Sequence, residues 1–152
     1  MNPADNMRTI VAVRAIGSTL LHLAWSDDTR ADVDLATMLH DRAFASLRDP
    51  DEFAKAEVGD WGHSLSWPSG AELGADTLWL ETLAATGRGD TRLFVEWRLR
   101  NALSLTKAAE ALGLSRRMVA YYSNGEKRVP KSILLACRGW EVGGGEELHR
   151  AA

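Results

Sequence analysis

Cysteine is almost absent from this sequence, in which Cys137 is the single example among 152 residues. One cysteine cannot form an intramolecular disulfide, which suits a reducing compartment. No apolar run approaches the roughly 18 residues that a membrane-spanning helix needs. The opening segment "MNPADNMRTIVAV" lacks the basic region, apolar block and small-residue cleavage site of a secretory signal. Together these absences predict a cytoplasmic protein that is not attached to a membrane.

Catalytic and metal-binding patterns are also missing. His22, His40 and His63 occur among aspartates, but none belongs to a His-x-x-x-His pair and no cysteine cluster joins them. The segment "GHSLSW" differs from the Gly-x-Ser-x-Gly turn of hydrolases. The glycines at 143–145 follow no predicted strand, so they do not form a phosphate-binding loop. We therefore expect no enzyme, metal or cofactor, and an enzyme in the amino-terminal part stays a minor alternative.

Charge is distributed unevenly along the chain. Residues 1–87 contain 6 lysines and arginines against 14 aspartates and glutamates, whereas residues 88–140 contain 11 against 4. The net charge of −3 for the whole chain therefore conceals an acidic part and a basic part. This asymmetry predicts two units with different partners, of which the basic one is a candidate for binding a polyanion.

The amino-terminal part, residues 1–86, is predicted to be an α+β domain with a small antiparallel sheet and short helices. Its strand candidates are β-branched or alternate between apolar and polar residues, namely "RTIVAVRAI", "TLLHLAWS", "RADVDL" and "SLSW". Asp34 is placed to cap a short helix in "LATMLH". Further helices are predicted in "DPDEFAKA", which starts with Asp-Pro, and in "GADTLWLETLAA".

The second part, residues 90–141, is predicted to be entirely helical, and residues 142–152 are predicted to be a flexible tail with adjacent glycines. Phe94 and Trp97 should face inward from the first helix. The expected helix starts are Thr91, then Ser104 or Thr106, then Ser115, then Pro130 at a first helical position, and the second and third helices should end at Gly113 and Gly125.

The spacing between residues 105 and 122 fits two helices that cross steeply through a short turn. Ala109 supplies the small side chain that a close crossing needs, and Gly113 can adopt a left-handed turn conformation. Apolar residues for the interior are Ala108, Leu112, Leu114, Val119 and Tyr122. The residues of the second helix that would then face outward or lie at its edge are Arg116, Arg117, Ala120, Tyr121 and Ser123.

Arg116 and Arg117 directly follow Ser115, at the start of that second helix. In helix-turn-helix modules this turn enters the major groove of DNA, where an arginine can donate two hydrogen bonds to a guanine edge or neutralise a phosphate. The alternative is that both arginines only line a solvated helix face. Tyr121 could equally pack at the edge of the helix. The six tryptophans and Cys137 are expected to serve packing.

The segment "LSLTKAAEALGLSRRMVAYYSNGEK" resembles the lambda-repressor-like helix-turn-helix domains of the xenobiotic-response-element family of transcription regulators. The resemblance covers residues 92–140, although Leu105 stands where many members have a glutamine that touches DNA. It implies that Arg116, Arg117 and Tyr121 face bases. It also implies that Thr106, Lys107, Asn124 and Lys127 lie near phosphates. With Ser115 and Ala120 on the same helix, these residues are the candidate DNA-binding set.

The amino-terminal part resembles the small α+β family called domain of unknown function 2442. The resemblance covers residues 7–83 and rests on "VDL", "FASLRDPDEFAKAEVGDWGHSLSW" and "GAELGADTLW". It implies a fold and supplies no activity.

The sequence as a whole predicts a sequence-specific protein for double-stranded DNA, such as a small bacterial transcriptional regulator. One helix-turn-helix domain touches too little DNA for tight and selective binding, so we expect a homodimer, with the amino-terminal domain as the dimerising part. The alternative is a protein-interaction module, such as an antitoxin or adaptor, that has the helix-turn-helix shape without reading DNA.

Overall fold

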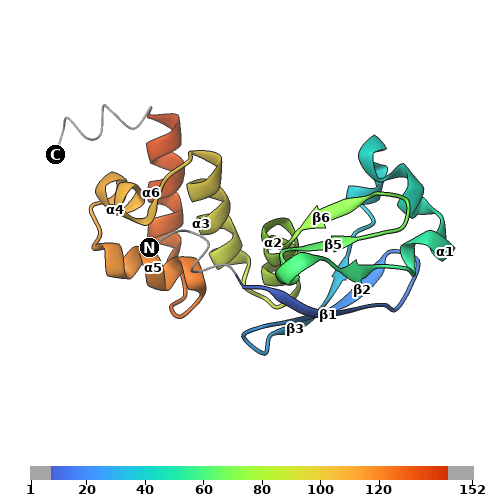
Figure 1. Ribbon diagram of the computed structural model, residues 1–152. Coiled ribbons are helices and arrows are strands. Elements are labelled where there is room, and N and C mark those ends of the chain that lie inside the picture. The colour runs from blue at the N-terminus through green and yellow to red at the C-terminus, as the bar shows by residue number, and fades with distance from the viewer. Residues whose placement is uncertain (1–7, 144–152) are drawn as a thin grey trace. The chain divides into compact units, whose positions relative to one another are not determined.

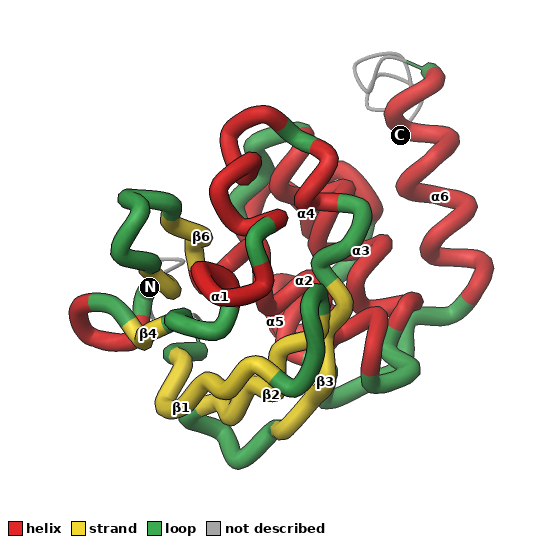
Figure 2. Tube along the Cα trace, turned by 90° about the vertical axis from the view of Figure 1, so that its right-hand side faces the viewer, coloured by secondary structure: helices red, strands yellow, loops and turns green. Residues whose placement is uncertain are grey.

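The computed structural model describes residues 8–143, and the chain divides into two compact units, Met1–Thr86 and Gly87–Ala152. The first unit combines strands with short helices, and the second is helical in its described part (Figures 1 and 2). None of the described helices is long and apolar enough to cross a bilayer. The predicted tail lies outside the described residues from residue 144 onward.

Two three-stranded antiparallel sheets form the framework of the first unit (Figure 1). The first sheet has the order β1 (Ile10–Ala15), β2 (Leu20–Trp25) and β3 (Arg30–Asp34), and the second has β4 (Glu57–Val58), β5 (Ser64–Ser66) and β6 (Glu72–Gly74). The four predicted strand segments are therefore confirmed, as is the α+β class. In β3, Ala31 and Val33 are buried while Asp32 and Asp34 are exposed. The alternation of apolar and polar residues in the sequence therefore identifies the buried and the exposed face of this strand correctly.

Helices connect and cover these strands. They are the 3-10 turns η2 (Met38–His40), η3 (Arg42–Arg48) and η4 (Asp60–Gly62), and the α-helices α1 (Pro50–Phe53) and α2 (Ala75–Ala85). The predicted helix after Asp34 is only the single turn η2, and Asp34 does not cap it. Its carboxylate instead accepts a hydrogen bond from the Ala36 N–H at 2.9 Å. Ala36 is only two residues further along the chain and precedes η2, so its N–H is nearer to the carboxylate than the N–H groups of the helix.

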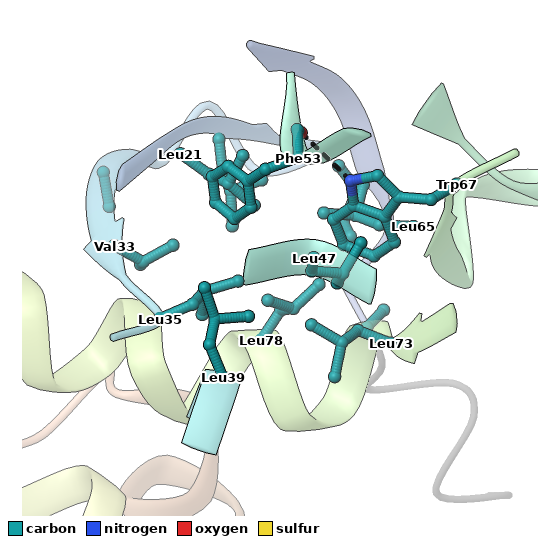
Figure 3. Packing of buried hydrophobic residues seen from close by; sticks show 14 of the residues in the cluster. Leu21, Val33, Leu35, Leu39, Leu47, Phe53, Leu65, Trp67, Leu73 and Leu78 are labelled. Carbon is teal, nitrogen blue, oxygen red and sulfur yellow. Dashed lines mark hydrogen bonds between the residues drawn. The ribbon is translucent and has the colours of Figure 1, made fainter. Parts of the chain in front are cut away.

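The core of the first unit lies between the sheets and α2 (Figure 3). Phe53 and Trp67 stack with 6.4 Å between ring centres, and the Trp67 indole N–H donates to the Phe53 carbonyl oxygen at 3.0 Å. The Trp25 indole N–H donates to the buried Thr82 hydroxyl at 3.0 Å, which ties β2 to α2. Buried polar atoms are thus satisfied where aromatic rings fill the interior.

Trp61 is an exception to the prediction that the tryptophans serve packing, because its side chain is 87% exposed. It adopts a left-handed backbone conformation, with φ of 59°, in the turn η4. The adjacent Gly62 also has a positive φ, of 74°, and is buried against the backbone of Ile10. This turn therefore holds a large ring in solvent while the glycine beside it makes the close contact with β1.

Gly62→Ala is expected to destabilise the first unit by about 2 kcal/mol or more. A Cβ at this position would lie 2.5 Å from the Ile10 carbonyl oxygen, and the left-handed φ adds strain for any residue other than glycine. Urea denaturation followed by circular dichroism measures the change. The control is Gly70→Ala, because Gly70 also has a positive φ but no atom lies within 4 Å of its Cβ position. Equal losses in the two variants would show that the close contact contributes nothing.

Four helices form the described part of the second unit, α3 (Gly89–Arg100), α4 (Leu105–Leu112), α5 (Arg116–Asn124) and α6 (Lys131–Val142). Ser104 and Ser115 cap α4 and α5, each accepting a hydrogen bond at 3.1 Å from the backbone N–H three residues later. Gly113 and Gly125 end these helices in the left-handed conformation, as predicted. Pro130 is the cap residue that precedes α6, whereas the prediction made it the first residue of the helix.

Two further sequence predictions for this unit are wrong. Thr91 does not cap α3, which starts at Gly89 with Arg88 in the cap position, and Thr91 is fully buried in the first turn. Ser123 does not face outward from α5 but is buried, at 9% exposure. It follows Val119 by four residues, so it lies on the same inward face of the helix.

The core of the second unit joins α3 to α4, α5 and α6. Phe94 and Trp97 are buried as predicted, at 0% and 1% exposure, and Phe94 also meets Tyr122 edge-on with 5.5 Å between ring centres. Ala108 and Val119 are fully buried between the helices. The interior predicted from the spacing in α4 and α5 is therefore present, although Leu112 and Leu114 are only partly buried and pack at its edge.

Cys137 lies in α6 and is buried, as predicted. Burial raises the pKa of its thiol to about 12, and the negative charge of Glu141 adds to this rise. Because the thiolate is the nucleophilic form of cysteine, this side chain is unreactive near neutral pH.

Candidate nucleic-acid interface

The candidate DNA-binding residues all belong to the second unit, and they lie on α4, α5 and the loop that follows α5. Helices α4 and α5 pack against each other, so their first turns are held in one rigid element. Thr106 and Lys107 are in the first turn of α4, Ser115 caps α5, Arg116, Arg117, Ala120, Tyr121 and Asn124 are on α5, and Lys127 follows it.

Arg116 and Arg117 are both exposed in the first turn of α5, but their surroundings differ. Within residues 8–143, Arg116 has no hydrogen-bond or ion-pair partner. The Arg117 Nε donates to the Tyr121 hydroxyl at 2.6 Å, and its guanidinium carbon lies 5.4 Å from the centre of the Tyr121 ring. One arginine is therefore available for a ligand, and the other is held in a fixed position by a side chain one turn later.

Arg117, Tyr121 and Lys127 form what we call the Tyr121 cluster. The Lys127 ammonium lies 5.2 Å from the Tyr121 ring centre, which places a second cation beside the same ring. The Lys127 backbone N–H donates to the Tyr121 carbonyl oxygen at 3.3 Å, so the loop is also tied to the end of α5. Cation–π contacts of this kind orient both positive charges without neutralising them.

The first turn of α5 contains no acidic residue, and its N–H groups carry the positive end of the helix dipole. The Ser115 hydroxyl satisfies one of these N–H groups. A solvated helix start with two arginines and no carboxylate favours an anionic ligand.

The candidate phosphate-binding residues on α4 and at the end of α5 differ in whether other side chains of the protein already bind them. Lys107 is exposed, and its ammonium lies 3.6 Å from the Glu110 carboxylate, a surface contact that binds it weakly. Thr106 is exposed as well. Asn124 is engaged with Glu126, because its Oδ1 accepts from the Glu126 N–H at 2.9 Å and its Nδ2 donates to the Glu126 carboxylate at 3.1 Å. Asn124 thus shapes the turn that ends α5.

Sequence reasoning missed a set of contacts that anchors the loop after α5, which we call the loop anchor (Arg88, Asp90 and Arg128). The Asp90 carboxylate accepts from the Val129 N–H and from Arg128 Nη1, both at 2.8 Å. Arg128 also donates to the Gly87 carbonyl oxygen at 2.9 Å, and Arg88 donates to the Gly125 carbonyl oxygen at 2.7 Å. Arg128 is therefore used inside the unit. The pairing joins residues 38 positions apart, so no local signal predicts it.

Asp90→Ala should destabilise the second unit by about 1–3 kcal/mol, because it leaves the Val129 N–H without a partner. Burial raises the pKa of the Asp90 carboxyl, but hydrogen bonds from Val129, Arg128 and Thr91 outweigh this effect and leave the pKa below its ordinary value of 3.8. The stabilisation is therefore complete above that value and is lost as the pH falls below it.

Urea denaturation of wild type and Asp90→Ala at pH 7 and pH 3 measures both effects. Glu110→Ala is the matched control, since it removes an exposed carboxylate of the same unit and should change stability by at most about 0.5 kcal/mol. A difference between wild type and Asp90→Ala that stays constant over this pH range would contradict the assignment.

The histidines do not assemble a metal site in the part of the chain that the structure describes. His22 Nδ1 lies 2.7 Å from the Asp32 carboxylate across β2 and β3, on the exposed side of the sheet. Within the described residues, no group of three His, Cys, Asp or Glu side chains is placed to hold a metal ion.

Comparison with known proteins adds two findings. Residues 10–82 match DUF2442, "Protein of unknown function". The crystal structure of Putative DNA Binding Protein NE0471 from Nitrosomonas europaea is similar to this chain with a TM-score of 0.69 and 38% sequence identity, covering 88% of this chain and 86% of that one. No curated protein matches the chain.

The first finding confirms the resemblance of the amino-terminal part to DUF2442, whereas the lambda-repressor-like character of the second unit stays a prediction. The identity to the Nitrosomonas europaea protein extends over most of both chains and therefore includes both units. The chain belongs to the same family as that protein, and its residues 10–82 are a DUF2442 domain.

Proposed function

We propose that this protein binds double-stranded DNA sequence-specifically and acts as a transcriptional regulator, with the second unit used as a lambda-repressor-like helix-turn-helix domain. The observation that carries the proposal is the start of α5, where Arg116 is exposed and without a partner among the described residues while Arg117 is held by Tyr121. An arginine without a partner can donate hydrogen bonds to a base edge, and an oriented arginine beside it can contact a phosphate and so fix the position of the protein on the DNA.

The local geometry supports this use of α5. Helix α4 ends at Gly113 in a left-handed turn, and α5 starts after the Ser115 cap, so the connection is short. Val119 and Tyr122 hold the inner face of α5 in the core, which leaves its first turn in solvent. A helix presented in this way fits the major groove of DNA.

Charge supports the same surface. Residues 88–140 carry 11 lysines and arginines against 4 acidic residues, and part of this excess lies in the Tyr121 cluster and on Lys107. The relative from Nitrosomonas europaea is named for DNA binding, which agrees with this assignment. The first unit is acidic and would be repelled by DNA, so we assign it to dimerisation, which would place two α5 helices about 34 Å apart on a two-fold site.

Selection of bound fragments from random duplex DNA, followed by affinity measurements over a range of salt concentrations, tests the proposal. We expect a defined site with two-fold symmetry. The logarithm of the affinity should fall linearly with the logarithm of the salt concentration, with a slope near −0.9 for each neutralised phosphate. Retention of no fragment at low salt would contradict DNA binding and would favour the interaction-module alternative. A single asymmetric half-site would contradict only the dimer.

A further inference from the structure

A groove with a volume of about 420 Å³ runs between α3 and α6 of the second unit. Leu93, Leu134 and Leu135 line it, together with the buried residues Trp97 and Cys137. Leu93 and Leu135 are 56% and 58% exposed, so the groove is an apolar surface that the described chain leaves open to solvent. Exposed leucines gathered around a groove are typical of a binding surface.

The lining residues recur with helical spacing on both walls. On α3, Leu93, Trp97 and Arg100 follow one another at intervals of four and three residues. On α6, the corresponding positions are Lys131, Leu134, Leu135 and Arg138. The Arg100 guanidinium and the Glu141 carboxylate pair at 2.8 Å, which joins the last turns of the two helices. Two adjacent helices that both expose apolar side chains with this spacing form a groove that can hold the apolar face of a third, amphipathic helix.

The charges at the groove indicate what kind of helix fits. Glu141 is already paired, since hydrogen bonds from Arg100 and Asn101 lower the pKa of its carboxyl to about 2. Lys131 and Arg138 are exposed, and neither has a carboxylate partner within residues 8–143. The edge of the groove is therefore positive, with two cations that a ligand can neutralise.

We infer that this groove binds an amphipathic helix of a partner protein that presents leucine-type side chains flanked by carboxylates. A second copy of this groove would bring Lys131 and Arg138 against equal charges, which disfavours pairing between copies. Duplex DNA would neutralise the two cations but would leave Leu93 and Leu135 against a charged backbone. None of the lining residues belongs to the candidate DNA-binding set, so the inference does not depend on the proposed function.

Fluorescence anisotropy with the full-length chain tests the inference. The probe is a fluorescein-labelled peptide of about 16 residues, roughly four helical turns, with leucines on one face and glutamates on both flanks. The matched control peptide keeps the leucines and has lysines in place of the glutamates. We expect the glutamate peptide to bind at least about tenfold more tightly than the lysine peptide, with a preference that weakens as salt is raised.

Variants of the chain make the test specific to the groove. Leu93→Ser and Leu135→Ser should each weaken binding of the glutamate peptide about tenfold, whereas Leu99→Ser should leave it unchanged. Leu99 is also on α3 and 50% exposed, but it does not line the groove. The double variant Lys131→Glu with Arg138→Glu should reverse the preference, so that the lysine peptide binds more tightly. Because all these side chains are at least partly exposed, the variants are expected to fold.

Four results would overturn the inference. The first is that neither peptide binds, and the second is that Leu99→Ser weakens binding as much as Leu135→Ser. The third is that duplex DNA displaces the glutamate peptide, which would assign the groove to nucleic acid. The fourth is that sedimentation equilibrium shows a dimer that Leu135→Ser dissociates, which would assign the groove to a second copy of the chain.

Discussion

Phe94→Ala is expected to destabilise the second unit by about 3–5 kcal/mol, the range for removing a buried aromatic side chain. Phe94 is fully buried on α3 and contacts the rings of Trp97 and Tyr122, with 5.7 and 5.5 Å between ring centres. Its loss would leave a cavity where α3 meets α5, and the two neighbouring rings are too constrained to fill it. Because the loss approaches the total stability of a small domain, part of the unit is expected to be unfolded at room temperature.

Hydrogen exchange of the amides in α3 and α5 measures this effect for the second unit alone, since the free energy of opening is obtained for each segment. The adjacent Leu93→Ala is the matched control, because Leu93 is 56% exposed and should lose less than about 1 kcal/mol. Equal protection factors in the two variants would show that Phe94 is not a centre of this core.

Arg116→Ala is expected to weaken binding to the selected DNA site by about 5- to 150-fold, which corresponds to the roughly 1–3 kcal/mol of one bidentate contact with a base. Binding to unrelated DNA should change much less, so the variant loses selectivity more than affinity. The prediction rests on Arg116 being exposed and unpartnered among the described residues, whereas Arg117 is held by Tyr121. Competition assays with selected and scrambled duplexes measure both quantities.

Lys127→Ala provides the contrasting control within the same surface. Removal of a cation that contacts a phosphate should weaken binding to all sequences alike and should reduce the salt slope by about one. Arg30→Ala, which removes an exposed arginine of the acidic first unit, should leave both quantities unchanged. If Arg116→Ala behaved like Lys127→Ala, Arg116 would be a backbone contact and another residue would read the bases.

Local features of the structure were predictable because the deciding atoms are close in sequence. Ser104 and Ser115 cap helices through hydrogen bonds to N–H groups three residues later, and Gly113 and Gly125 end helices through their own φ angles. The alternating strand that starts at Arg30 was recognised for the same reason. In each case one or two residues are enough to favour the local conformation.

Features that depend on distant residues were not predictable. Thr91 is a good helix cap by type, but Arg88 takes that position and donates to the Thr91 hydroxyl at 3.2 Å, while it also reaches Gly125. Nothing in the sequence distinguishes Asp90 from the other acidic residues, because its partner Val129 is far away in the chain and is brought close only by the fold. The two-residue strand β4 is too short to show a periodic pattern. Tertiary contacts decided all three.

The candidate interface was predicted more completely than the groove. Arg116 and Arg117 are recognisable because they follow a helix cap in a basic region. Leu93 and Leu135 are apolar residues on helices that also carry Phe94 and Cys137, so residue type alone does not show which of them are buried. Only the packing of α3 on α6 reveals which apolar side chains are left uncovered.

The exposed ring of Trp61 gives the first unit an optical signal of its own. Trp25, Trp67 and Trp97 are at most 4% exposed, so a water-soluble quencher such as acrylamide reaches Trp61 far more readily than these three. A molecule that covers the turn η4 would shield this indole and reduce the quenching of its emission. Fluorescence of the unmodified protein can therefore be used to search for ligands that cover this turn of the first unit.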